Sequence, residues 1–229
     1  QHVKIGGNRD GRILAYRIDV IQDAGAYGRI GLLLPSLTCL MAPGVYDIPE
    51  VQTGFRQVVT NATPISAYRG AGRPEATAAV ERAVDLFAAA IGMDPAEVRR
   101  RNFVPADQFP FQTKTGALYD SGRYEEALDK VLAAAGYDQL REEQRRRRAS
   151  GDLRQLGIGV SAYVEITAAD AGAGETAKIE VKDDGTAVVY TGSSAHGQGH
   201  HTAWAMLVQD ELGIPMDQIT VIHGDTDLI

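Results

Sequence analysis

A loop of small residues and arginines at residues 67–76, Ala-Tyr-Arg-Gly-Ala-Gly-Arg-Pro-Glu-Ala, has the composition of an anion-binding loop. Two glycines on either side of a small alanine allow close approach to the backbone, and N–H groups at the start of a helix attract negative charge. Arg69 and Arg73 add forked donors that suit a phosphate or a metal-bound oxygen. A plain tight turn with solvated arginines is the alternative interpretation. The candidate site residues are Arg69, Gly70, Ala71 and Gly72.

A second glycine-rich loop, Thr-Gly-Ser-Ser-Ala-His-Gly-Gln-Gly-His-His-Thr at residues 191–202, also leads into a predicted helix. The amide of Gln198 lies between two glycines and can both donate and accept a hydrogen bond. The edge of a heterocycle or a metal-oxo ligand requires this combination. The candidate binding residues are Gly197, Gln198, Gly199 and His200.

The histidines of this loop suggest a zinc site, because His196 and His200 are four residues apart and His223 could join them. Two observations argue against it. The glycines around Gln198 disfavour a helix through His196, and no carboxylate occupies the position of a general base. Histidines that cap or line the loop are the favoured interpretation, and we assign no metal ligand.

The sequence contains no motif for nucleotide binding or for hydrolysis by a serine nucleophile. Neither loop has a Walker lysine or the G-x-G-x-x-G spacing of nucleotide-binding loops, and no G-x-S-x-G motif occurs. The only cysteine, Cys39, lies in the apolar stretch Leu-Thr-Cys-Leu-Met, which predicts a buried, inert thiol. A single cysteine also excludes an iron–sulfur cluster, a disulfide or a cysteine-rich zinc site within this chain.

Charge and hydropathy exclude further classes of function. The net charge is −7 and the pI is about 5.2, which argues against a nucleic-acid partner. The longest apolar run, 30–34, is much shorter than the roughly 20 residues that span a bilayer. Because the first residues do not resemble a secretory signal, we expect a cytoplasmic protein.

Hydrophobic periodicity predicts the elements of the first part of the chain. Alternation indicates strands at 12–21 and 51–60, with a loop at 42–50. Apolar residues at helical spacing predict a helix from Pro74, which suits the first turn, to a stop at Gly92. Two further helices are expected at 95–101 and 124–135. The charged segment 139–148 ends in four arginines; a solvated helical face with i, i+4 pairs or a linker is favoured over a basic patch for an acidic partner.

Ser150 and Gly151 mark a predicted boundary, after which strands are expected at 156–166, 177–182 and 186–191. The last two are joined by a hairpin turn at 183–185. A helix at 202–212 and a strand at 219–222 follow, the helix burying Trp204, Leu207, Val208 and Leu212.

Strands, a glycine-rich loop and a helix thus occur in both halves. We expect an α+β fold of two related lobes of mixed sheet packed with helices, with lobes at residues 1–150 and 151–229.

Five segments in one order carry a family resemblance: the two glycine-rich loops, Ala-Pro-Gly-Val-Tyr-Asp-Ile-Pro at 42–49, Glu-Leu-Gly-Ile-Pro at 211–215, and His-Gly-Asp-Thr-Asp at 223–227. Together they resemble the molybdopterin-binding large subunit of the molybdenum hydroxylases, the xanthine oxidase superfamily. The Ala-Tyr-Arg-Gly-Ala-Gly-Arg form is similar to a second class of aerobic carbon monoxide dehydrogenase-like large subunits.

The resemblance implies a molybdenum-cofactor-binding fold and a molybdopterin cofactor, in its cytosine dinucleotide form. It implies that Arg69 lines the molybdenum pocket as a catalytic residue and that Gln198 hydrogen-bonds the metal centre or pterin. Gly197 and Gly199 keep that approach open, and His201 departs from an acidic residue common in the family. The reaction implied is oxidation of a small substrate with water as the oxygen source.

Family large subunits are about three times longer, so we expect an internal fragment that is inactive alone. The family's Gly-Gly-Phe-Gly segment lies upstream and its catalytic glutamate downstream; Glu165 and Glu175 are in the wrong context to replace that base. Partner subunits or domains would carry iron–sulfur clusters and FAD. A cofactor-free binding or scaffold module is the second hypothesis, and a histidine-based zinc hydrolase the third.

Departures from the family indicate the substrate. Copper-dependent carbon monoxide dehydrogenases have a cysteine directly after the loop arginine, where this chain has Gly70. Purine-oxidising relatives place an arginine 32 residues before the loop arginine and a phenylalanine two after it; these positions are Leu37 and Ala71 here. We therefore expect an aldehyde or a different N-heterocycle as the substrate of the parent enzyme.

Overall fold

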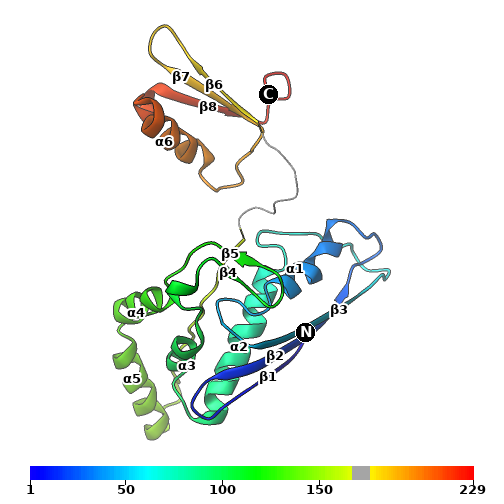
Figure 1. The fold of residues 1–229 in the computed structure, drawn as a ribbon, viewed down its shortest axis with the longest axis vertical. Coiled ribbons are helices and arrows are strands. Elements are labelled where there is room, and N and C mark those ends of the chain that lie inside the picture. The colour runs from blue at the N-terminus through cyan, green and yellow to red at the C-terminus, as the bar shows by residue number, and fades with distance from the viewer. Residues whose placement is uncertain (167–175) are drawn as a thin grey trace. The chain divides into compact units, whose positions relative to one another are not determined.

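A computed structural model describes residues 1–166 and 176–229 of the chain. The chain divides into two compact units, residues 1–166 and 167–229, each with its own sheet (Figure 1). This division falls after the predicted lobe boundary at residues 150 and 151, because the segment 156–166 packs on the first unit.

The first unit contains a three-stranded sheet in the order β1-β2-β3 (Figure 1). β1 (His2–Gly7) runs antiparallel to β2 (Ile13–Asp23), and β2 runs parallel to β3 (Glu50–Val58). One face of β2 is buried through Tyr16, Ile18 and Val20, as the alternation in the sequence predicts. The short helix α1 (Leu34–Leu40) connects β2 to β3.

The long helix α2 (Arg73–Ile91) packs against this sheet, and its bounds agree with the prediction. Pro74 lies in its first turn, and Gly92 ends it at a φ of 72°. α3 (Pro95–Asn102) follows, and the Asp94 carboxylate accepts a hydrogen bond from the Ala96 N–H at 2.8 Å to cap it. The core of the unit lies between α2 and the sheet.

Two helices and a small hairpin complete the unit. The strands β4 (Phe111–Gln112) and β5 (Leu118–Tyr119) form an antiparallel pair. α4 (Tyr124–Ala135) agrees with the prediction, and α5 (Tyr137–Ser150) contains the arginine run. Glu143 pairs with Arg147 at 2.7 Å, which is the expected i, i+4 ion pair on a helical face, and also with Arg146 at 2.7 Å, an i, i+3 pair that was not predicted.

The strand predicted at 156–166 is wrong. Its residues are alternately half-buried and exposed, but they form no strand ladder with the described residues. Val160, Ala162 and Val164 instead pack on the core of the first unit. An extended segment lying on a core buries every second side chain as a strand does, so the pattern alone does not distinguish the two.

A buried polar cluster connects this segment to the helices. The Arg99 guanidinium is fully buried and donates to Glu81 at 2.9 Å and to Asp85 at 2.9 Å. Glu81 also accepts from the Tyr46 hydroxyl and, at 3.0 Å, from the Ala162 N–H. Burial, followed by the Glu81 charge, raises the pKa of Tyr46 well above its usual value, so this hydroxyl stays protonated and donates.

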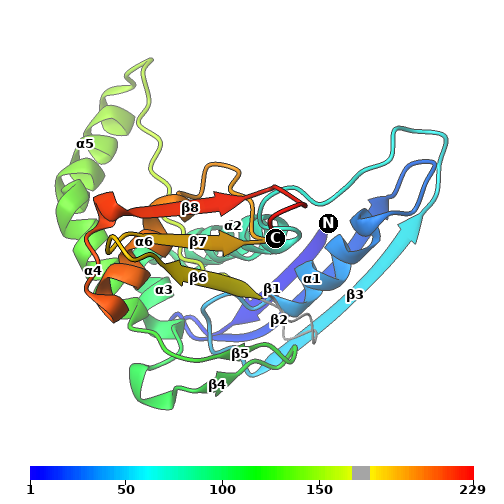
Figure 2. The same ribbon diagram turned by 90° about the horizontal axis from the view of Figure 1, so that it is seen from above.

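The second unit has a sheet of the same strand order and directions. β6 (Ala177–Val181) runs antiparallel to β7 (Ala187–Thr191), which lies between β6 and β8 and runs parallel to β8 (Ile219–His223) (Figure 2). A helix, α6 (His200–Leu212), connects β7 to β8 as α1 connects β2 to β3. The shared topology confirms the predicted α+β fold of two related lobes of mixed sheet and helices.

Only part of the predicted inner face of α6 is buried. Val208 is buried and Trp204 half-buried, whereas Leu207 and Leu212 are 55% and 50% exposed and were wrongly predicted to point inward. A narrow three-stranded sheet covers only one stripe of the helix, through Trp204 and Val208. Among the described residues, no helix combines the length and apolar character needed to cross a membrane.

Candidate functional site

The first candidate loop lies at the carboxyl ends of two parallel strands. The segments after β2 and β3 run side by side there: the Ala24 N–H donates to Val58 O at 2.8 Å, and the Ala26 N–H to Ala62 O at 3.0 Å. The Gly25 N–H and the Thr60 hydroxyl donate to Asp23 and lower the pKa of that carboxyl. This edge is where open α/β sheets bind ligands.

The turn at Gly70, Ala71 and Gly72 has three successive positive φ angles, of 93°, 40° and 90°. Ala71 is the only non-glycine residue with a positive φ among the described residues. The turn is seated on α1, where the Thr38 hydroxyl donates at 2.9 Å to Gly72 O. The N–H groups of Gly70 and Gly72 have no acceptor among the described residues. The turn therefore leaves two unpaired N–H groups at the start of α2, one on the half-buried Gly70 and one on the buried Gly72.

Replacing Gly72 with alanine tests how tightly the turn is seated. A Cβ at this position would lie 2.4 Å from Leu34 O at a φ of 90°, so we expect a loss of about 3 kcal/mol in the free energy of unfolding. Gly92 at the other end of α2 is a matched control, because its φ is 72° and nothing lies within 4 Å of an added Cβ. Its alanine variant should lose about 1 kcal/mol. Equal losses in urea denaturation would contradict the predicted close packing.

The two arginines of the loop differ in their surroundings. Arg69 is exposed and forms no hydrogen bond or ion pair with another described residue. Arg73 points inward: its Nη1 lies 3.4 Å from Gly70 O and 3.3 Å from Ala71 O, and its side chain is only 14% exposed. Of the two forked donors indicated by the sequence, only Arg69 is presented to a ligand.

Exposed apolar side chains occur on the segments that contact the first loop or lead into it. Gly31 lies against Ile65, so the segment after β2 touches the one that leads to the loop. Leu37 of α1 contacts Gly72, since a Cβ on that glycine would be 3.0 Å from the Leu37 Cβ. Exposed side chains of these segments are Tyr27, Ile30, Leu33 and Tyr68.

The second candidate loop lies in the second unit between β7 and α6, a position that corresponds to the segment between β2 and α1 of the first unit. Gly197 and Gly199 have φ angles of 99° and 79°, and a Cβ on either would meet nothing within 4 Å. The Gln198 Oε1 accepts from the His196 N–H, while its amide NH₂ has no partner among the described residues. Open glycines on both sides of an exposed amide can accept a flat ligand that needs hydrogen bonds.

The histidines near this loop form no metal cluster. His200 stacks on Trp204 with ring centroids 5.5 Å apart, and its Nδ1 lies 3.4 Å from Ser193 O. His201 lies beside His223, with centroids 4.7 Å apart. Within residues 1–166 and 176–229, no group of three or more metal-ligating side chains is found. The zinc hypothesis therefore gains no support, and the histidines line the loop and the end of β8.

Cys39 is buried in α1, as its apolar neighbours predict, and burial raises the pKa of its thiol. A thiol in this setting is a poor nucleophile.

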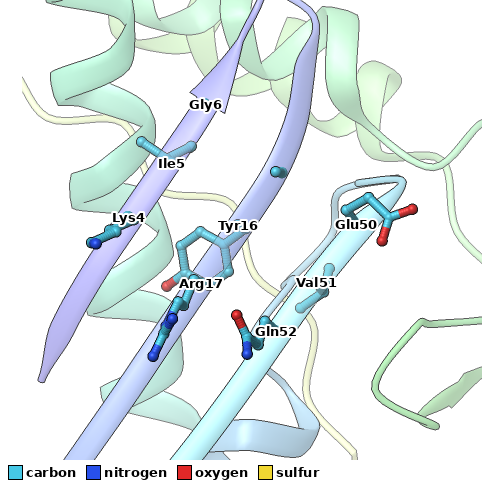
Figure 3. Close-up of a pocket in the computed structure, with 9 residues that line it drawn as sticks. Lys4, Ile5, Gly6, Tyr16, Arg17, Glu50, Val51 and Gln52 are labelled. Carbon is cyan, nitrogen blue, oxygen red and sulfur yellow. The ribbon is translucent and has the colours of Figure 1, made fainter.

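A shallow hollow of about 540 Å³ on the first sheet contains none of the candidate residues (Figure 3). Its floor includes Lys4, Arg17 and Gln52, which are opposite one another in the register of three neighbouring strands. None of the residues that line this hollow belongs to either loop. We therefore keep the two loops as the candidate site.

Sequence reasoning did not identify the residues that hold the loops in place. Thr38 and Leu37 lie more than 30 residues before Gly72, and no local motif marks their contact with it. Glu165, set aside as a base, lies with its Oε1 3.5 Å from Arg73 Nε. These contacts join segments far apart in the chain.

Comparison with known proteins points to one cofactor. Two family models, both described as the molybdopterin cofactor-binding domain, match residues 1–103 and 130–229. The carbon monoxide dehydrogenase large chain of Hydrogenophaga pseudoflava is 37% identical over 97% of this chain and 30% of its own length. The 6-hydroxypseudooxynicotine dehydrogenase complex subunit gamma of Paenarthrobacter nicotinovorans is 36% identical over 96% of this chain and 28% of its own.

Among solved structures, quinoline 2-oxidoreductase from Pseudomonas putida 86 is similar with a TM-score of 0.87 and 30% identity, over 97% of this chain and 30% of that one. The chain thus spans less than a third of the length of the relatives it matches.

Proposed function

The chain belongs to the molybdopterin cofactor-binding domains, and we propose that it is part of the cofactor-binding subunit of a molybdenum-dependent oxidoreductase. The observation that carries this proposal is the pair of helix-entry loops, at residues 69–73 and 196–200, in which the N–H groups of Gly70 and Gly72, the Arg69 side chain and the Gln198 amide NH₂ have no partner among the described residues. The first loop lies directly before α2 in the part matched by one family model, and the second lies directly before α6 in the part matched by the other.

The residues present fit such a cofactor. Free N–H groups at Gly70 and Gly72 and the unpaired Arg69 suit anionic groups, and the open backbone around Gln198 suits the edge of a pterin. We propose that the cofactor is held by Gly70, Ala71, Gly72, Gly197, Gln198, Gly199 and His200.

When bound, the cofactor would supply molybdenum as the acceptor of the two electrons removed from a carbon centre of the substrate, with water as the oxygen source. Arg69 acts as the catalytic residue of this chain: its free guanidinium stabilises negative charge that develops on the substrate. The Gln198 NH₂ donates to the cofactor and fixes its orientation, while its Oε1 stays bound to the His196 N–H.

The finer assignments rest on the resemblance to carbon monoxide dehydrogenase-like subunits. They are the cytosine dinucleotide form of molybdopterin and partner chains that carry iron–sulfur clusters and FAD. One relative is itself named as a subunit of a dehydrogenase complex.

Molybdenum content of the intact parent protein tests the cofactor assignment against a cofactor-free scaffold. Gly199→Ala adds a methyl group where the cofactor is proposed to lie, and we expect about tenfold weaker retention of molybdenum. Gly213→Ala is the control, because Gly213 ends the same helix at a φ of 69° with open space around it. Both variants should lose about 1 kcal/mol of stability. Equal molybdenum content in both, or none in the wild type, would refute the proposal.

We propose an aldehyde or a non-purine N-heterocycle as the substrate. Gly70 offers no side chain to bind copper, and an added Cβ would lie 2.7 Å from the Pro74 ring. Leu37, which touches Gly72, and Ala71 cannot supply the cation and aromatic ring that purine-oxidising relatives have at these positions.

Steady-state assays of the parent complex test this assignment. We expect turnover of aldehydes or pyridine-like rings, and xanthine turnover at least about 100-fold slower, because Leu37 and Ala71 leave the polar groups of a purine unpaired. Efficient oxidation of xanthine, or copper-dependent oxidation of carbon monoxide, would exclude it.

A further inference from the structure

The side chain of Arg73 connects the turn at residues 70–72 to the segment 156–166. Its Nη1 donates to the carbonyls of Gly70 and Ala71, at 3.4 and 3.3 Å. Its Nε lies 3.5 Å from Glu165 Oε1, which makes an ion pair across more than 90 residues of chain. Nη1 thus holds the turn, whereas the buried Nε has the Glu165 charge nearby but no hydrogen-bond partner among the described residues.

The turn needs such support because its backbone is strained. Three successive residues have positive φ, and for Ala71 the left-handed conformation costs about 1–2 kcal/mol. A strained turn persists only where its surroundings hold it. Arg73 binds two of the carbonyls that this conformation turns inward, so the guanidinium is part of that support.

A guanidinium that is only 14% exposed needs a counter-charge to remain in place. Among the described residues, Glu165 supplies the one carboxylate within ion-pair distance of Arg73. Without that charge the guanidinium has a lower free energy in water than in its half-buried place. It would turn toward the solvent and lose its hydrogen bonds to the turn.

Glu165 is itself held by a fixed segment. The Ala162 N–H donates at 3.0 Å to Glu81, which the fully buried Arg99 anchors. Val164, next to Glu165, packs against buried residues of the core. The backbone that carries the Glu165 carboxylate is therefore tied to α2 and α3.

We propose that Glu165 is a positioning residue: through Arg73 it holds the turn at residues 70–72 and so directs the exposed side chain of Arg69. Its effect on turnover rests on the proposed function of Arg69. Its effect on the turn does not. Glu165 thereby acquires a role that requires neither contact with substrate nor proton transfer.

Hydrogen exchange in the intact parent protein without cofactor tests the structural step. The Ala71, Arg73 and Ala76 N–H groups are protected by bonds to Tyr68, Gly70 and Gly72 carbonyls. In Glu165→Gln they should exchange about five- to tenfold faster, as expected for loss of a partly buried ion pair. Glu75→Gln removes a charge from the same region without touching Arg73, and should leave these rates unchanged. Unchanged exchange in Glu165→Gln would overturn the proposal.

A double-mutant cycle tests the link to Arg69. Glu165→Gln should lower kcat/KM in the wild-type protein but have no further effect in Arg69→Ala, because it acts through that side chain. Glu165→Asp keeps the charge and should restore part of the loss. An equal loss in both backgrounds would overturn the positioning role. If the parent protein shows no molybdenum-dependent turnover, the proposed function is wrong, but the hydrogen-exchange result still tests the role of Glu165 in holding the turn.

Discussion

We expect replacement of Arg69 by alanine in the intact parent protein to lower kcat/KM by about 10²- to 10³-fold while its molybdenum content is unchanged. The reason is that Arg69 is the exposed cation of the first loop and has no partner among the described residues, so its charge is available to the reacting groups. Lysine at this position keeps the charge but not the planar fork, and should recover only part of the rate.

Arg82→Ala is the control for this experiment. Arg82 is an exposed arginine of α2 in the same unit and should be neutral. Full activity of Arg69→Ala at full molybdenum content would refute the catalytic assignment. Loss of molybdenum together with activity would make Arg69 a residue that holds the cofactor instead.

Arg99→Met should cost about 3–5 kcal/mol of the free energy of unfolding, because it leaves Glu81 charged and buried without its ion pair. Total stabilities of about 5–15 kcal/mol are usual, so the loss is a large fraction of the stability of the first unit. Proteolysis should then cleave the segment 156–166 more readily, because Ala162 is bound to the same carboxylate. Urea denaturation and limited proteolysis measure the two effects.

Arg100→Met is the matched control on the same helix. Arg100 pairs with Asp129 and Glu125 at the surface and is 30% exposed, so its loss should cost no more than about 1 kcal/mol. Removing Glu81 and Arg99 together should cost less than the sum of the single losses. Similar losses for Arg99→Met and Arg100→Met would contradict the importance of the buried cluster.

Local signals in the sequence were sufficient for the elements that carry the loops. Pro74 and Gly92 bound α2 because each restricts or frees the backbone at its own position, whatever the rest of the chain does. The glycines at 70, 72, 197 and 199 have the positive φ angles that such turns require. Helical spacing identified α4, and alternation identified β2, β3, β6 and β7.

Patterns failed where burial depends on distant parts of the chain. The alternation at 156–166 predicted a strand, but the segment is an extended chain on a core with no neighbouring strand to pair with. Leu207 and Leu212 follow helical spacing and yet remain exposed, because the described sheet is too narrow to cover them.

By itself, the sequence determined the helices α2, α3, α4 and α6, the strands β2, β3, β6, β7 and β8 and the glycine-rich turns, and it presented the loop residues in the order typical of one cofactor-binding family. Only the tertiary structure decided how their charges are used. Arg69 and Arg73 have the same side chain four residues apart, but one is free at the surface and the other is bound to Glu165 and the turn. Likewise, Arg99 is buried while its neighbour Arg100 is at the surface. Whether a charge meets water or a buried partner depends on residues distant in the chain, which no local pattern encodes.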